Sequence, residues 1–427
     1  MAVAVLALLL ALLAASLPVA SALGAVALAL DGFYSSLPLA RALGEQAWST
    51  SRDFLLVAIP MFVMLGEILL RAGVAERMYG AMVKWLSWLP GGLMHSNIGA
   101  CAVFAATSGS SVATAATVGT VALPLVRRHG YDERLFLGTL AAGGTLGILI
   151  PPSINLIIYA VLTDTSIPKL YLAGIVPGIG LALLFMLMIA AACLLRRDWA
   201  GEPVRVAWRE RLASLADLAP PLGIFLVVVG SIYAGFATPT ESAALGVIAA
   251  LGLAGAYGRL SLRMLREVLQ NTMRITAMIM LIIVAAAFLN FVVSAIGLSA
   301  ALTGFIAGLG LSKYAMLVAL VVFYLLLGSV METLSMMITT IPILAPVMIG
   351  LGFDPVWLGI VLIILVEAAL ITPPVGLNLY VVHSLRNGGS LNDVIVGSTP
   401  FVIAMLALIV LLTVFPGIAL WLPGVLT

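Results

Sequence analysis

Long stretches without a charged residue alternate with short polar segments along this chain. Six of these stretches lack Asp, Glu, Lys and Arg: Met1 to Leu30, Trp85 to Val126, Leu135 to Thr163, Leu170 to Leu195, Ile275 to Ser312 and Val394 to Thr427. A helix that crosses the hydrocarbon core of a bilayer needs about 20 apolar residues. The pattern therefore predicts an all-α polytopic membrane protein.

The composition agrees with this prediction. Of the 427 residues, 63% are hydrophobic and 9% are charged, whereas soluble proteins carry about 25% charged residues. A net charge of +2 gives no sign of a nucleic-acid surface. Cys101 and Cys193 stand alone in apolar segments, so we interpret them as small core residues. The first residues lack the basic start of a signal peptide and are interpreted as a membrane span.

The two halves of the sequence are weakly similar at an offset of about 222 residues. The matching positions occur in the same order in both halves: Leu17-Pro18 with Thr238-Pro239, Ala72-Gly73-Val74 with Ile296-Gly297-Leu298, Pro124 with Pro346, Pro151-Pro152 with Pro373-Pro374, and Pro177 with Pro400. One pair alone has no weight, but the ordered series predicts an internal repeat.

The distribution of basic residues predicts that the two repeats have opposite orientations. The segment 127–134 contains three arginines, and its counterpart 350–355 has no basic residue. Because short basic loops stay in the cytoplasm, equivalent loops of the two halves should lie on opposite sides of the membrane. Inverted-topology repeats of this kind are typical of secondary transporters.

These signals divide the chain into two repeats joined by a basic cytoplasmic linker. Basic segments flank both ends of one uncharged stretch, which should therefore enter and leave the membrane by the same face. The path predicts ten crossings and two re-entrant hairpins. Its segments are a first repeat at 1–195 with a hairpin at 93–126 and a broken helix at 134–163, a linker at 196–217, and a second repeat at 218–427 with a hairpin at 314–348 and a broken helix at 355–385.

The hairpin tips and the two Pro-Pro breaks are the candidate binding region. Broken helices leave backbone groups unpaired, which lipid tolerates only where they line a cavity. Carboxyl ends of half-helices offer oxygens to a cation, and amino ends attract an anion. Oxygen-bearing side chains lie close by: Ser108, Ser110, Ser111, Thr114, Asn155, Thr333, Ser335, Thr339, Thr372 and Asn378. Small polar residues also mediate close helix packing, an alternative that we favour for isolated ones but not for 107–111.

Four acids within or beside the apolar segments need separate interpretation. Glu332 stands at the tip of the second hairpin and should tune the ion site. Glu367, before the second break, is open between contact with an ion or proton and capping of a hairpin backbone. Glu241 follows Thr238-Pro239 and should satisfy amide groups at a helix start. Glu67 should pair with Arg71 one helical turn later.

At these motifs the sequence resembles the large membrane subunit of TRAP (tripartite ATP-independent periplasmic) transporters, the DctM-like family. The resemblance runs almost end to end. The stretches that carry it are Ile59-Pro60-Met61-Phe62, Trp88-Leu89-Pro90-Gly91-Gly92, Ser108-Gly109-Ser110-Ser111, Gly130-Tyr131-Asp132, Ile150-Pro151-Pro152-Ser153, Ala173-Gly174-Ile175-Val176-Pro177-Gly178, Thr238-Pro239-Thr240-Glu241, Met331-Glu332-Thr333 and Thr372-Pro373-Pro374-Val375-Gly376-Leu377-Asn378.

The resemblance implies a sodium-driven elevator carrier in the bacterial inner membrane. Such subunits work with a small four-helix membrane subunit, here expected as a separate chain, and with a periplasmic substrate-binding protein. Their solutes are organic acids such as C4-dicarboxylates, 2-oxo acids or sialic acid. No cofactor is implied beyond Na⁺ as the coupling ion. Sodium is expected at Thr107, Ser108, Gly109, Ser110, Ser111, Asn155, Glu332, Thr333, Ser335, Thr372 and Asn378, and the broken-helix and solute region at Gly144, Pro151, Pro152, Ser153, Pro373, Pro374 and Gly376.

Two other functions compete with this interpretation. A stand-alone cation-coupled carboxylate symporter shares every feature described so far and differs only in needing no partner proteins. An intramembrane hydrolase needs a base within reach of Ser110 or Ser111. His95 lies about 22 Å from the tip along a helix, and His129 and His383 fall in other segments. No HExxH or GxxxxGK[ST] pattern occurs, so we do not expect an enzyme.

Overall fold

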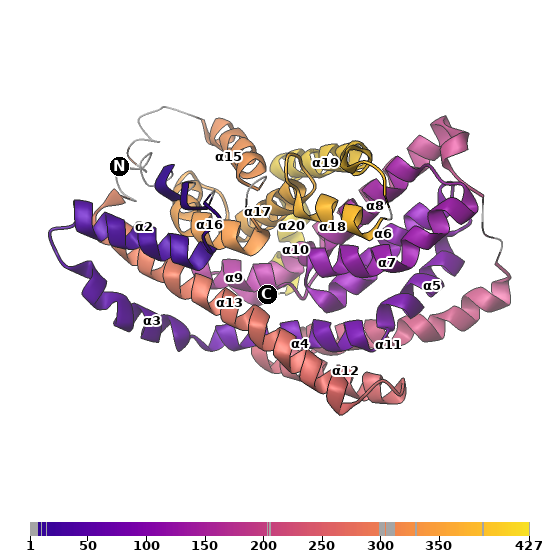
Figure 1. The fold of residues 1–427 in the computed structure, drawn as a ribbon, viewed down its shortest axis with the longest axis horizontal. Coiled ribbons are helices and arrows are strands. Elements are labelled where there is room, and N and C mark those ends of the chain that lie inside the picture. Colours follow the sequence, from indigo (N-terminus) through magenta and orange to yellow (C-terminus); the bar gives the residue numbers. More distant parts are fainter. Residues whose placement is uncertain are drawn as a thin grey trace.

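Helices make up nearly all of the chain that the structure describes (Figure 1). This computed structural model describes residues 7–9, 11–13, 15–202, 204, 206–298, 304, 312–328, 331–386 and 388–426, without the side chains of 106–108 and 127. Within these residues the one β-type contact is an isolated bridge between Tyr131 and Ala200. The prediction of an all-α membrane protein is confirmed.

The first half contains two adjacent hairpin helices followed by a helix pair with a break between its members. Its described helices are α2 (Val19–Tyr34), α3 (Leu43–Ser51), α4 (Ala58–Arg71), α5 (Val74–Leu86), α6 (Gly92–Ser108), α7 (Ser111–His129), α8 (Glu133–Leu149), α9 (Ile154–Thr163) and α10 (Ile167–Leu195). Helices α6 and α7 occupy the expected hairpin, and α8 with α9 occupies the expected broken helix.

The second half follows the same order of elements. Its described helices are α11 (Trp208–Tyr233), α12 (Pro239–Ala256), α13 (Leu262–Ala295), α15 (Lys313–Leu327), α16 (Thr333–Gly350), α17 (Pro355–Leu370), α18 (Leu377–Leu385), α19 (Leu391–Val414) and α20 (Gly417–Leu426). Helix α11 begins inside the segment expected to be a linker. Good helix formers such as Arg209, Glu210 and Arg211 extend it beyond the apolar span.

Seven described helices are long and apolar enough to cross a membrane, or eight if the bent pair of α8 and α9 is one span. Several other apolar helices are shorter, among them α2, α15 and α17. The ten crossings of the sequence path include the spans that α2 and α17 occupy, and these helices have 16 residues each. They also include one in the first residues of the chain, few of which are described.

Two helices that are buried on every side form the centre of the molecule. All residues of α8 from Leu135 to Leu149 and all residues of α17 from Val356 to Leu370 are buried. A helix without a polar face is stable only where other helices surround it. Helix α8 packs against α6, α7 and α19, and α17 packs against α10, α15 and α16.

Glycine permits a backbone-to-backbone contact between α8 and α19. A Cβ atom added at Gly138 would lie 2.0 Å from the carbonyl oxygen of Gly397, and one at Gly397 would lie 1.8 Å from that of Arg134. No larger residue fits at either position while the helices keep this separation. The contact holds the buried helix of the first half directly against the last long helix of the second.

A chain of buried hydrogen bonds fixes the first hairpin helix between its neighbours. The Tyr79 hydroxyl of α5 donates to Asn97 Oδ1 of α6 at 3.0 Å, and Asn97 Nδ2 donates to Thr139 Oγ1 of α8 at 2.8 Å. Buried polar groups of this kind are stable only when they are paired. Helix α6 is therefore held in register with α5 and α8, which positions the hairpin tip.

Candidate functional site

The tip of the first hairpin is a two-residue reversal between α6 and α7. Gly109 has a φ of 61° and ends α6, a left-handed conformation that suits glycine. Ser110 is extended, and its side-chain oxygen accepts a hydrogen bond from Ala113 N at 3.4 Å, which caps α7. A Gly-Ser pair therefore stops one helix and starts the next within two residues.

The first Pro-Pro break lies directly against this tip. Helix α8 ends at Leu149, and the Ser153 hydroxyl caps α9 by accepting from Leu156 N at 3.3 Å. The two helices differ in direction by 46°. A Cβ atom on Gly109 would lie 3.3 Å from the carbonyl oxygen of Pro152, so the tip rests on the break.

Glu332 begins the second helix of the other hairpin. Helix α15 ends at Leu327, and residues 329 and 330 of the expected tip lie outside the described residues. The Glu332 carboxylate accepts hydrogen bonds from Ser335 N at 3.2 Å and from Ser335 Oγ at 3.3 Å, which caps α16. Its position at a helix amino end compensates part of the positive end of the helix dipole.

The second Pro-Pro break is arranged differently from the first. The Thr372 hydroxyl donates to Ala368 O at 2.7 Å, and Gly376, with a φ of 53°, precedes α18. Pro373 and Pro374 are exposed, whereas their counterparts in the first break are buried. Both Pro-Pro peptide bonds are cis. The similar sequences of the two breaks therefore have different surroundings.

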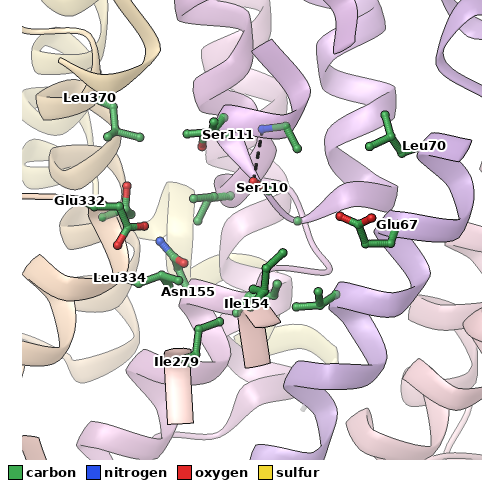
Figure 2. Close-up of a pocket in the computed structure, with 18 of the residues that line it drawn as sticks. Glu67, Leu70, Ser110, Ser111, Ile154, Asn155, Ile279, Glu332, Leu334 and Leu370 are labelled. Atoms are coloured by element: carbon green, nitrogen blue, oxygen red, sulfur yellow. Dashed lines mark hydrogen bonds between the residues drawn. The ribbon is translucent and has the colours of Figure 1, made fainter. Parts of the chain in front are cut away.

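A cavity of about 130 Å³ lies between the two tips and a wall formed by α4 and α13 (Figure 2). Both carboxyl ends and amino ends of helices surround this cavity. Gly109, Ile148 and Leu370 come from the carboxyl ends of α6, α8 and α17, while residues from the first turns of α7, α9 and α16 line the other parts. Apart from Glu67, the remaining wall is apolar: Val63, Gly66, Leu70, Phe104, Ile275 and Ile279.

This mixture of helix ends makes the cavity suitable for a cation and an anion together. The last carbonyls of a helix lack intrahelical partners and carry partial negative charge, and the first amides carry partial positive charge. Three amino ends reach the cavity: Ser111 and Val112 of α7, Asn155 of α9, and Thr333 of α16. The described lining residues include no Lys, Arg or His, so helix amides would have to hold an acidic solute.

Glu367 reaches the tip of the first hairpin although it belongs to the second half. The Ser111 hydroxyl donates to Glu367 Oε2 at 2.6 Å across 256 residues of sequence. Glu367 is buried, and its other oxygen, Oε1, has no hydrogen-bond partner. A buried carboxyl oxygen without a partner costs free energy. It is therefore an available oxygen ligand beside the tip of the first hairpin at Gly109 and Ser110, which we call the inner tip.

Asn378 and Gly144 lie behind the same tip. Asn378 Nδ2 donates to Ala141 O at 3.3 Å, while its Oδ1 is buried without a partner. A Cβ atom on Gly144 would lie 3.0 Å from Ser111 O and 3.1 Å from Asn378 Nδ2. Because Gly144 has no side chain, α7, α8 and α18 can meet at this point.

Glu67 faces the cavity from the side opposite Glu332 (Figure 2). Arg71 donates a hydrogen bond to it, as the spacing predicted, and Asn271 Nδ2 of α13 donates to it at 3.3 Å. The sequence interpretation placed Glu67 at a helix end and missed its contact with the cavity. Its position in an apolar helix whose one other charged residue is Arg71 was the signal that pointed to a functional place.

The predicted site residues fall into three groups. Gly109, Ser110, Ser111, Asn155, Glu332 and Thr333 line the cavity together. A second group, Gly144, Pro152, Ser153, Ser335 and Asn378, contacts the lining or caps its helices, and Pro151 is buried within the break. Thr372, Pro373, Pro374 and Gly376 do not line the cavity. The side chains of Thr107 and Ser108 lie outside the described part.

Comparison with known proteins places this arrangement in a family. The family described as "Tripartite ATP-independent periplasmic transporter, DctM component" matches residues 6–418. The chain belongs to this family. It is thus a transporter component rather than an enzyme, and a multi-pass protein of the bacterial inner membrane.

Three relatives show how far this DctM component resembles known proteins. C4-dicarboxylate TRAP transporter large permease proteins DctM from Pseudomonas aeruginosa and Rhodobacter capsulatus are 35% and 36% identical, with 88% and 87% of this chain and 88% of each relative covered. The sialic acid TRAP transporter large permease protein SiaM from Vibrio cholerae is 31% identical, with 87% of this chain and 86% of the relative covered.

A solved structure has the same fold at low sequence identity. The Alcanivorax borkumensis YdaH transporter, described as having an unusual topology, aligns with a TM-score of 0.55 at 16% identity. The alignment covers 87% of this chain and 89% of that chain. This DctM component therefore shares its overall arrangement of helices with another membrane transporter.

Proposed function

We propose that this DctM component takes up a small organic acid, of the C4-dicarboxylate class, in symport with sodium. The observation that carries the proposal is the cavity at which three helix amino ends and three carboxyl ends meet. Sodium prefers oxygen ligands, and carbonyls, hydroxyls and carboxylates supply them here. The amide ends supply the complementary charge for an acid.

Two buried oxygens without hydrogen-bond partners support a cation site at the inner tip. Glu367 Oε1 and Asn378 Oδ1 are both buried without a hydrogen-bond partner, and both residues lie against the Ser111 region. A bound sodium ion would satisfy such atoms, since they are otherwise cut off from water. Glu332 and Thr333 offer oxygens at the other tip.

The size of the cavity favours a small solute. Its volume of about 130 Å³ lies below the roughly 300–1,000 Å³ of typical ligand sites. The two relatives with the higher identities are named for C4-dicarboxylates, and the sialic acid relative is less similar. Both observations support a C4-dicarboxylate over a larger acid.

Two partners complete the proposed system. The family name describes a tripartite transporter, which we take to include a small four-helix membrane subunit and a periplasmic substrate-binding protein. A cavity without a basic side chain among its described lining residues selects weakly between acids. Selection by a separate binding protein fits such a cavity.

Uptake into proteoliposomes tests the proposal directly. The chain, its small subunit and the binding protein would be reconstituted together, with radiolabelled succinate as the probe and an inward sodium gradient. Accumulation should need both the gradient and the binding protein. Uptake that continues after the gradient is dissipated would refute sodium coupling, and uptake without the binding protein would favour a stand-alone symporter.

Two substitutions connect this assay to the site. Ser110→Ala removes the cap of α7, and Glu332→Gln removes the charge at the start of α16. Both should raise the sodium concentration needed for half-maximal uptake by a larger factor than that by which they lower the amount of protein in the membrane. Equal losses of protein and uptake would assign these residues a purely structural role.

We further propose that the tips move against the wall of α4 and α13 as an elevator. The wall presents Val63, Ile275 and Ile279 to the tips, and apolar side chains can slide without breaking hydrogen bonds. A thiol-specific cross-linker that joins Val63→Cys of the wall to Val112→Cys of the first tip, which line the same cavity, should block uptake. Full uptake by the cross-linked protein would show that the tip of the first hairpin does not move past α4.

A further inference from the structure

Helix α13 is longer than a membrane span. It contains 34 residues and extends for about 51 Å at 1.5 Å per residue, while the hydrocarbon core is about 30 Å thick. Its part from Ile275 to Ala295 carries no charged residue and alone spans about 31 Å. The turns from Leu262 to Arg274 therefore extend beyond the hydrocarbon core into the headgroup region.

These first turns are amphipathic, with an apolar side that nothing in the described chain covers. Leu262, Leu269 and Met273 are 86%, 51% and 71% exposed. Spacings of seven and four residues place them in one stripe along the helix. Met264 and Val268 lie on the opposite side and are buried against the bundle. The apolar stripe therefore faces outward from the protein.

Three unpaired arginines accompany the apolar stripe. Arg266 and Arg274 are exposed residues of α13, and Arg259 is an exposed residue of the loop before it. None of the three forms an ion pair with an acid in the described part of the chain. We call Arg259, Arg266 and Arg274 the α13 basic strip.

No acid of this segment is free to neutralise the strip. Glu267 is the single acid between residues 257 and 295. It already accepts from Arg263 at 3.2 Å and pairs with Arg71 at 3.5 Å. The strip thus presents positive charge that has no ion-pair partner among the described residues, beside apolar side chains that are exposed.

We propose that the α13 basic strip binds the phosphate groups of anionic phospholipids in the cytoplasmic leaflet. Arginines next to a charge-free span lie at the depth of the headgroups, and basic segments favour the cytoplasmic side. Leu262, Leu269 and Met273 enter the acyl region beneath those headgroups. Tyr257, whose ring lies 4.3 Å from the Arg77 guanidinium, is an aromatic residue of the kind common at this boundary.

The position of the strip favours lipid over a protein partner. Its charges and its apolar stripe run parallel along one helix that meets the bilayer surface, so headgroups and acyl chains can contact both at once. A protein partner would need an acidic and an apolar surface in the same register. Lipid anchoring of α13 would also steady the wall that α13 contributes to the cavity.

Retention of lipid through purification tests the inference without reference to transport. The purified chain would be equilibrated with vesicles of phosphatidylcholine that contain phosphatidylglycerol, extracted in detergent, and analysed by native mass spectrometry. A variant with Arg259→Gln, Arg266→Gln and Arg274→Gln should bind phosphatidylglycerol about fivefold more weakly for each arginine removed. Salt should weaken binding to the unmodified chain, and inorganic phosphate should compete no better than its ionic strength predicts.

Matched controls distinguish lipid binding by the α13 basic strip from a general effect of positive charge on the protein. Arg128→Gln, Arg197→Gln and Arg209→Gln remove three exposed arginines elsewhere and should retain most of the lipid. Replacing the strip with lysines should also retain it, because the charge is kept. If the triple glutamine variant fails to fold, Arg266→Gln alone should still bind phosphatidylglycerol about fivefold more weakly. Unchanged retention in the glutamine variant would overturn the inference. If the glutamine variant, purified together with the small subunit, lost that subunit but kept its lipid, the strip would instead be a protein interface and the inference would be overturned.

Discussion

One methyl group added at Gly144 should weaken sodium binding more than it lowers the stability of the protein. The glycine lies in α8 where α7 and α18 approach it. A Cβ atom added by Gly144→Ala would lie 2.7 Å from Ala115 Cβ, 3.0 Å from Ser111 O and 3.1 Å from Asn378 Nδ2. Ordinary contact begins at 3.4 Å, so these neighbours would need to move by 0.7, 0.4 and 0.3 Å.

This movement should change the free energy of unfolding and the free energy of sodium binding by different amounts. Overpacking by one methyl group costs about 1–3 kcal/mol, and alanine recovers about 1 kcal/mol over glycine within a helix. The free energy of unfolding should therefore fall by about 0–2 kcal/mol. Ser111 and Asn378, however, lie at the proposed cation site. Displacing their oxygens should weaken sodium binding at least about tenfold, a loss of about 1.4 kcal/mol that nothing offsets.

Thermal unfolding in detergent and the sodium dependence of uptake measure the two effects on the same protein. Gly180→Ala is the matched control, since a Cβ atom at this glycine of α10 meets nothing within 4 Å. It should leave both measurements close to those of the unmodified chain. If Gly144→Ala lowered the unfolding temperature but kept the original half-saturating sodium concentration, Gly144 would serve packing alone and the inner tip would not be the cation site.

Three further substitutions test other parts of the structure. Ser111→Ala removes the hydrogen bond to the buried Glu367 and should lower the free energy of unfolding by about 1–3 kcal/mol; no change in the unfolding temperature would contradict that contact. Gly138→Ala would place a methyl group 2.0 Å from Gly397 O, so size-exclusion chromatography should show little folded protein, and a normal monodisperse peak would argue against the close helix contact. Thr238→Ala removes a capping box and should cost about 0.5–2 kcal/mol of unfolding free energy with sodium affinity unchanged.

Local chemistry in the sequence determined where most helices begin and end near the site. Gly109 and Ser110 stop and start helices through their own backbone and side-chain preferences, as Pro151-Pro152 with Ser153 does at the first break. The capping role expected for Glu241 is likewise confirmed, because its partner Thr238 is three residues away. Such features depend on neighbours within one turn, which the sequence displays directly.

The tertiary structure decided which of these local features meet. Glu367 was open between an ion contact and a capping role, and its hydrogen bond to Ser111 joins residues 256 apart. The two Pro-Pro breaks look equivalent in sequence, yet one is buried against a tip and the other is exposed. Glu67 likewise faces the cavity because α4 packs beside α13 and across from the tips. Helical periodicity specifies which side of a helix is apolar, but the partner on that side depends on how all the helices pack at once.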